Sequence, residues 1–207
     1  MNKADRIQVH AIALATLLGV CACTAPAQRA LDARELPSDE KSIGMLLEES
    51  TVRELATDRH ALTTSILIAA PAQRVWDVLI DFERMPEWSP MLQKIEPTPL
   101  TDGRLVKVTS RLNGEDMVVN RTLIYAEGAY YGWSDEIELL PGIRDRHLYR
   151  VEVVDESHTR LVQSEEFSGD SERMNTEALA RYVAPLYRAF NEALKDEVQR
   201  RYAEQNP

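Results

Sequence analysis

Three polar residues stand within alternating apolar patterns in the middle of the chain, and their types suit acid–base chemistry. In residues 117–125 every second residue is apolar or aromatic except Arg121. In residues 131–137 the exception is Asp135, and in residues 147–153 it is His147. Because alternate residues of a strand share one face, the three side chains are predicted to lie on the inner face of a sheet. There an arginine can polarise a carbonyl group, while a carboxylate or an imidazole can move a proton.

Two other interpretations of these polar residues stay open. Each of them can lie at a strand end or face solvent, as His147 would if it sits close to the turn at Pro141-Gly142. Arg121 and Asp135 can also pair with one another. In either case the side chains have a structural role and no chemistry follows from them.

Other kinds of reactive site lack their sequence signals. The chain has no G-x-S-x-G nucleophile elbow and no glycine-rich phosphate loop. His60, His147 and His158 are not at metal-ligand spacing, so neither a metal nor a cofactor is expected. The adjacent carboxylates of "SEEFSG", at 164–169, point to opposite faces of a strand and cannot act as a pair.

Composition limits the class of protein. The 207 residues are 44% hydrophobic and 28% charged, with a net charge of -10, which is typical of a folded globular chain. Nucleic-acid binding needs a basic surface, and no cluster of Lys or Arg is present. No nucleic-acid partner is therefore expected.

The N-terminus reads as a targeting segment. A weakly basic start is followed by an apolar run from about Ala11 to Val20, which is too short to span a bilayer and has the length of a signal-peptide core. Cysteines follow at once and resemble the lipobox of bacterial lipoproteins. Cys23 is the better lipidation site because Ala22 precedes it, and Cys21 is the alternative. An ordinary signal peptide or an uncleaved anchor also fits the pattern.

These features divide the chain into three segments. Residues 1–22 are predicted to be a lipoprotein-type signal peptide, and 23–60 a linker in which 42–56 can form a short amphipathic helix. Residues 61–205 are predicted to form the folded domain. Localisation would then be a membrane-anchored lipoprotein of the cell envelope, or a secreted soluble protein if the signal is an ordinary one.

The domain shows a clear order of elements. A strand over 61–70 precedes a helix that starts at Pro71 and stops near Arg84, before Met85-Pro86, and Pro86 can open a second short helix. Strands joined by short turns, and therefore antiparallel, are predicted over 103–112, 117–128, 130–139, 146–154 and 159–169. A long helical pattern covers 171–205. The order predicts an α+β domain.

The corner after the first strand carries a family resemblance. The stretch "APAQRVWDVLIDFERMPEWSPML", the "GxxV" strand at 103–106, "SEEFSG" and the long final helix resemble the START-like, Bet v 1-like (SRPBCC) superfamily, and within it the bacterial polyketide cyclase/dehydrase-type proteins. The resemblance implies a helix-grip fold. In that fold a curved antiparallel sheet wraps around a long C-terminal helix, with two short helices after the first strand.

The resemblance also implies a cavity between the sheet and the helix. Its predicted lining combines the corner, the sheet-facing positions and the helix stripe: Trp88, Arg121, Tyr125, Trp133, Asp135, His147, Tyr149, Tyr182, Leu186 and Phe190. Core packing is the alternative role for Trp88. A mostly apolar cavity with a few polar groups favours binding or carrying of a hydrophobic small molecule or lipid.

Two further functions remain as alternatives. One is a cyclase or dehydratase that acts on a polyketide-like or other apolar substrate in the same cavity, with Arg121 polarising a carbonyl group and Asp135 or His147 moving the proton. The other is a partner protein of the envelope, which an exposed apolar patch outside the cavity would favour.

Overall fold

The computed structural model describes residues 49–205. The elements in chain order are β1 (Glu49–Ala56), β2 (Arg59–Ile68), α2 (Ala72–Leu79), α3 (Met85–Trp88), β3 (Leu92–Glu96), β4 (Leu105–Leu112), β5 (Glu115–Ala126), β6 (Tyr130–Trp133), β7 (Ile143–Val153), β8 (Thr159–Gly169) and α4 (Thr176–Gln205). The predicted signal peptide, including Cys21 and Cys23, lies outside the described residues. Within the described part, no helix has the length and apolar character needed to cross a membrane.

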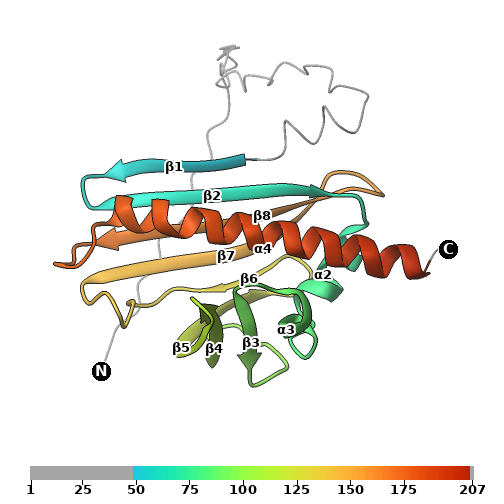
Figure 1. The fold of residues 1–207 in the computed structure, drawn as a ribbon, viewed down its shortest axis with the longest axis horizontal. Coiled ribbons are helices and arrows are strands. Elements are labelled where there is room, and N and C mark those ends of the chain that lie inside the picture. Colours follow the sequence, from blue (N-terminus) through green and yellow to red (C-terminus); the bar gives the residue numbers. More distant parts are fainter. Residues whose placement is uncertain (1–48, 206–207) are drawn as a thin grey trace, which may run out of the picture. The chain divides into compact units, whose positions relative to one another are not determined.

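The strands form one antiparallel sheet with α4 laid across it. The strand order is β1-β2-β8-β7-β6-β5-β4-β3, and each neighbouring pair is antiparallel. Figure 1 shows α4 (red) running along β2 and β8, while β5, β4 and β3 lie toward the edge of the sheet opposite β1. This is the predicted helix-grip arrangement of a curved sheet around a long C-terminal helix.

Local backbone chemistry fixes the strand pairing at two places. Asn113 and Gly114 both have positive φ angles, 52° and 84°, as a two-residue hairpin turn between β4 and β5 requires. Gly132 in β6 lies so close to β7 that an added Cβ would meet the His147 carbonyl oxygen at 1.8 Å. A side chain at Gly132 would therefore push β6 away from β7.

The corner between β2 and β3 differs in detail from the prediction. The first helix ends at Leu79, with Ile80 as its C-cap, and does not reach Arg84. The chain turns there and buries Phe82, whose ring packs edge-on against Tyr131 at a centroid distance of 5.7 Å. Proline opens the short helix α3 as expected. The strand β3 that follows was not predicted. It has five residues, and its two apolar ones, Leu92 and Ile95, are three residues apart and so do not alternate as in a strand.

The helix expected within 42–56 is wrong for its described part. Residues 49–56 form β1, which pairs antiparallel with β2 at the edge of the sheet. Seven of its eight residues are exposed, and only Val52 packs against the core. Pairing with the free edge of β2 satisfies the backbone groups of both strands, and this tertiary interaction outweighs the weak helical pattern. The "first strand" of the prediction is therefore β2.

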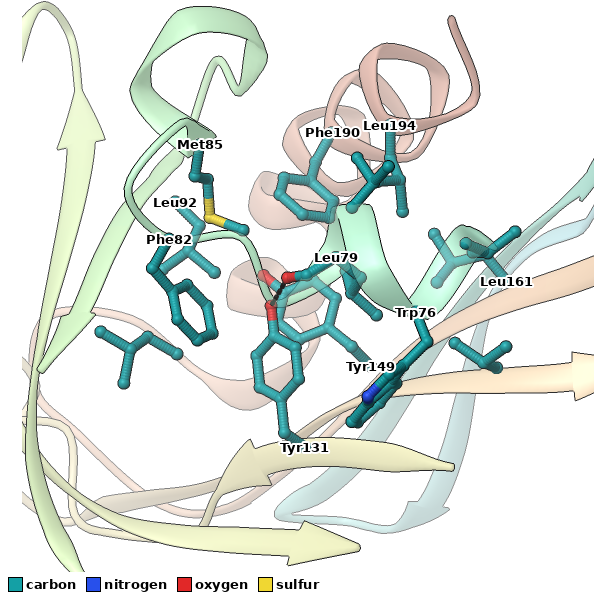
Figure 2. Packing of buried hydrophobic residues seen from close by; sticks show 14 of the residues in the cluster. Trp76, Leu79, Phe82, Met85, Leu92, Tyr131, Tyr149, Leu161, Phe190 and Leu194 are labelled. Atoms are coloured by element: carbon teal, nitrogen blue, oxygen red, sulfur yellow. Dashed lines mark hydrogen bonds between the residues drawn. The ribbon is translucent and has the colours of Figure 1, made fainter. Parts of the chain in front are cut away.

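Aromatic side chains fill the core at the α2–α3 end of the sheet (Figure 2). Trp76 of α2 contacts Tyr131 of β6 at 6.3 Å, and Tyr131 contacts Tyr149 of β7 at 5.0 Å. Phe190 of α4 closes the cluster against Tyr149 at 5.0 Å and Trp88 at 5.5 Å. The helix is therefore fixed to the sheet at this end by aromatic packing.

The burial of Phe190 leads to a stability prediction. Phe190 is fully buried, so Phe190→Ala is expected to lower the free energy of unfolding by about 3–5 kcal/mol, measured by urea denaturation. Tyr182 lies on the same helix and is 52% exposed, so Tyr182→Ala should cost about 1 kcal/mol or less. A loss for Phe190→Ala as small as that expected for Tyr182→Ala would show that this face of α4 does not pack on the core.

Candidate functional site

A hollow of about 520 Å³ lies between the sheet and the N-terminal half of α4. Most of its lining is apolar and comes from β4, β5, β8, α4 and the segments before β3, after β6 and before α4: Met91, Leu112, Met117, Ile137, Leu139, Leu140, Phe167, Met174, Leu179, Val183 and Leu186. Polar side chains are grouped on β5, β7, β8 and α4. We call this hollow the cavity.

The polar groups meet because of the register between β7 and β8. His147 of β7 pairs directly with Glu165 of β8, and Tyr149 pairs with Gln163. Two-residue periodicity turns Asp145 to the same face as His147 and Tyr149. All five side chains are buried. The sheet therefore places two carboxyl groups and one imidazole side by side away from water.

Hydrogen bonds join these groups to the neighbouring strand and helix. An Arg121 guanidinium nitrogen lies 3.5 Å from an Asp145 carboxylate oxygen, and the carboxyls of Asp145 and Glu165 are close enough for each to affect the pKa of the other. The Tyr187 hydroxyl of α4 donates to Glu165 and lies 3.0 Å from Nδ1 of His147. We call the connected set the buried polar chain: Arg121, Asp145, Glu165, Tyr187, His147 and Gln163.

The direction of the Tyr187 hydrogen bond assigns the tautomer of His147. Because the Tyr187 hydroxyl donates to Glu165, its oxygen accepts from Nδ1 of His147, and Nε2 is left to accept from the Gln163 side-chain nitrogen at 3.1 Å. The imidazole proton then resides on Nδ1. The hydrogen bonds therefore run in one direction from Gln163 to Glu165.

Burial keeps most of the buried polar chain uncharged. Burial raises the pKa of Glu165 well above its ordinary value, and the neighbouring Asp145 charge adds to this. Burial also lowers the pKa of His147 to about 3, with a smaller contribution from Arg121. Burial raises the pKa of Asp145 too, but Arg121 and the backbone N–H of Asp135 oppose that shift and stabilise the anion. We therefore assign the proton to Glu165 and the negative charge to Asp145.

These shifts have opposite effects on stability. Between the folded pKa of about 3 and the ordinary value of 6.5, the unfolded chain binds a proton at His147 that the folded chain does not, so His147 destabilises the fold as pH falls. Glu165 holds its proton more tightly in the folded state, so its contribution to stability is lost as pH rises through its folded pKa. As the pH rises, the stability gained when His147 loses its proton in the unfolded chain is thus partly offset by the stability lost through Glu165.

Six of the predicted site residues line the cavity: Arg121, Trp133, His147, Tyr149, Tyr182 and Leu186. His147 is 2% exposed, so the alternative in which it faces solvent is wrong. Tyr182 is half exposed and stands at the mouth. The Tyr149 hydroxyl is buried and has no hydrogen-bond partner within residues 49–205. Whether these residues contact a ligand stays a prediction.

The other four predicted residues lie elsewhere. Trp88 and Phe190 pack against each other in the aromatic core, as the core alternative for Trp88 proposed. Tyr125 packs against Trp76 at 6.1 Å. The Asp135 carboxylate accepts hydrogen bonds from the backbone N–H and the hydroxyl of Thr122, at 2.7 and 2.9 Å. It follows the end of β6, where the alternation no longer holds, so it does not pair with Arg121.

Sequence reasoning missed four members of the buried polar chain: Asp145, Glu165, Tyr187 and Gln163. The signal for Glu165 was present, because Gln163, Glu165 and Phe167 alternate within a predicted strand. Asp145 was missed because the strand was predicted to begin at residue 146, whereas β7 begins at Ile143. Within residues 49–205, no group of three or more His, Cys, Asp or Glu side chains is arranged to hold a metal ion.

Comparisons with known proteins agree with this architecture. No curated protein sequence matches the chain. The fold is similar to the Zhui aromatase/cyclase from Streptomyces sp. R1128, with a TM-score of 0.55 and 21% identity over 70% of this chain and 96% of that chain. It is also similar to a START superfamily protein from Mycobacterium smegmatis, with a TM-score of 0.54 and 15% identity over 68% and 97%.

At these identities the two structures establish the fold alone. The family model described as "Polyketide cyclase / dehydrase and lipid transport" matches residues 59–199, from the start of β2 into the last turns of α4. The edge strand β1 precedes the match. The chain belongs to the polyketide cyclase/dehydrase and lipid transport family.

Proposed function

We propose that this protein binds or carries one apolar small molecule or lipid in the cavity between the sheet and α4. The observation that carries the proposal is the composition of the cavity lining. Apolar side chains form most of the lining, and the buried polar side chains are gathered in one group. Its volume of about 520 Å³ falls in the range of small-molecule sites, roughly 300–1,000 Å³. The family description, which includes lipid transport, supports the same function.

A second candidate is an enzyme of the cyclase or dehydratase kind. The observation in its favour is the connected set of a protonated carboxyl, a phenol and a neutral imidazole inside an apolar cavity. Neutral His147 is a base and protonated Glu165 is an acid, so the pair has the complementary states that proton transfer needs. In this role His147 replaces Asp135, which lies outside the cavity.

Filling the cavity is the direct test of ligand binding. Val183 lines the cavity, so Val183→Trp is expected to weaken binding of the neutral dye N-phenyl-1-naphthylamine about tenfold or more, measured by fluorescence titration. Val153 is 71% exposed and does not line the cavity, so Val153→Trp should bind the dye like the unaltered protein. Circular dichroism would verify that both variants are folded.

Native mass spectrometry of the protein after incubation with a bound ligand separates the two candidate functions. A ligand recovered at its original mass and chromatographic retention supports carrying, whereas a ligand that has lost water supports a dehydratase and an isomer with a different retention supports a cyclase. Failure of the dye and of a panel of lipids and quinones to bind would contradict both.

We further propose that the domain is held at the cell envelope through a lipid on Cys23, with Cys21 as the alternative site. The support is the sequence of the first 23 residues, in which an apolar run ends in two cysteines. A lipid anchor would keep the cavity close to the membrane from which apolar molecules are taken. Secretion as a soluble protein is the alternative localisation.

Cys23→Ser tests this localisation. In a bacterial host the full chain should appear in the membrane fraction and incorporate labelled palmitate, and Cys23→Ser should abolish both. Cys21→Ser is the matched change and should have no effect. Equal labelling of the unaltered protein and Cys23→Ser would contradict lipidation at Cys23.

A further inference from the structure

The only lysine or arginine among the residues that line the cavity is Arg121, and its charge is already engaged. One guanidinium nitrogen lies 3.5 Å from the Asp145 carboxylate, and another donates to the backbone oxygen of Glu136 at 3.2 Å. The side chain is 8% exposed, so solvent does not screen this pairing. A carboxylate ligand would therefore have to compete with Asp145 for the guanidinium group.

The other acidic groups of the cavity leave no positive charge for an anion to pair with. Asp145 and Glu165 both line the cavity, and each carboxyl affects the pKa of the other. With the proton on Glu165, the charges of Arg121 and Asp145 cancel. A ligand carboxylate placed beside these buried side chains would add an unpaired negative charge, which is strongly unfavourable.

An uncharged polar group meets a different environment. Tyr149 is among the residues that line the cavity, and its buried hydroxyl has no hydrogen-bond partner within the described residues, so a ligand group that reaches it would meet an unsatisfied hydrogen-bonding group. A hydroxyl or carbonyl group can pair with it without adding charge. The apolar lining toward the mouth can then cover the rest of the molecule.

We infer that the cavity selects uncharged apolar molecules that end in a hydroxyl or carbonyl group, and that it rejects the corresponding carboxylates. This selectivity rests on the proposed function, because it specifies which apolar ligands the cavity takes. Its basis is the pairing of Arg121 with Asp145, which removes the one cation that a fatty acid would need.

A matched pair of ligands tests the selectivity. Dodecan-1-ol and dodecanoate have the same chain length, and at pH 7 only the second is charged. In displacement of N-phenyl-1-naphthylamine from the full chain, the alcohol is expected to bind at least about tenfold more tightly than the carboxylate.

Asp145→Asn provides the gain-of-function arm of the test. Removing the Asp145 charge frees Arg121, so dodecanoate should bind about tenfold or more tightly than it does to the unaltered protein, while dodecan-1-ol changes less. Asp77 is exposed on α2 and outside the cavity, so Asp77→Asn should leave both affinities unchanged. If Asp145→Asn does not fold, the comparison of the two ligands on the unaltered protein still decides.

The outcomes separate this inference from the function on which it rests. Dodecanoate binding as tightly as dodecan-1-ol, or more tightly, overturns the selectivity and leaves apolar ligand binding in place. Failure of the dye and both dodecyl compounds to bind overturns the proposed function, and the selectivity with it.

Discussion

The burial of the Arg121–Asp145 ion pair is the constraint on which the rest of the site depends. Charges removed from water are tolerated only when they are paired and their remaining hydrogen-bonding groups are satisfied. Arg121 comes from β5 and Asp145 from β7, so the pair forms only if β6 lies between them in the observed register. The short strand β6, with Gly132 packed against the backbone of β7, keeps the two strands close enough.

The neutral groups of the buried polar chain follow from that pair. Asp145 holds its charge beside Arg121, and a second carboxyl next to it retains its proton, since two adjacent buried anions would repel each other. The Tyr187 hydroxyl from α4 then links Glu165 to neutral His147. The helix is thus joined to the sheet by the hydrogen bonds of Tyr187 and by aromatic packing around Phe190. The cavity lies on the N-terminal side of these contacts, beneath the first half of α4.

The fold was largely predictable from the sequence because its signals are local. Alternation identified β4, β5, β7 and β8, and Pro71 marked the start of α2. The edge strand β1 escaped prediction because it depends on pairing with β2 and buries only Val52. Arg121 and His147 were found because an inward polar residue is visible within one strand. Their partners were not found, because cross-strand register and the approach of Tyr187 from α4 are not encoded in any single segment.

The charge distribution of the site depends on whether Glu165 is protonated inside the folded protein at neutral pH. A carbon-13 NMR titration of its side-chain carboxyl, assigned by the signal lost in Glu165→Gln, measures this directly. We expect the chemical shift of a protonated carboxylic acid at pH 7, with no change as the pH passes the ordinary pKa of 4.5. A carboxylate shift at pH 7, with a titration near 4.5, would show that the buried polar chain carries a net negative charge and would contradict the assignment of the proton to Glu165.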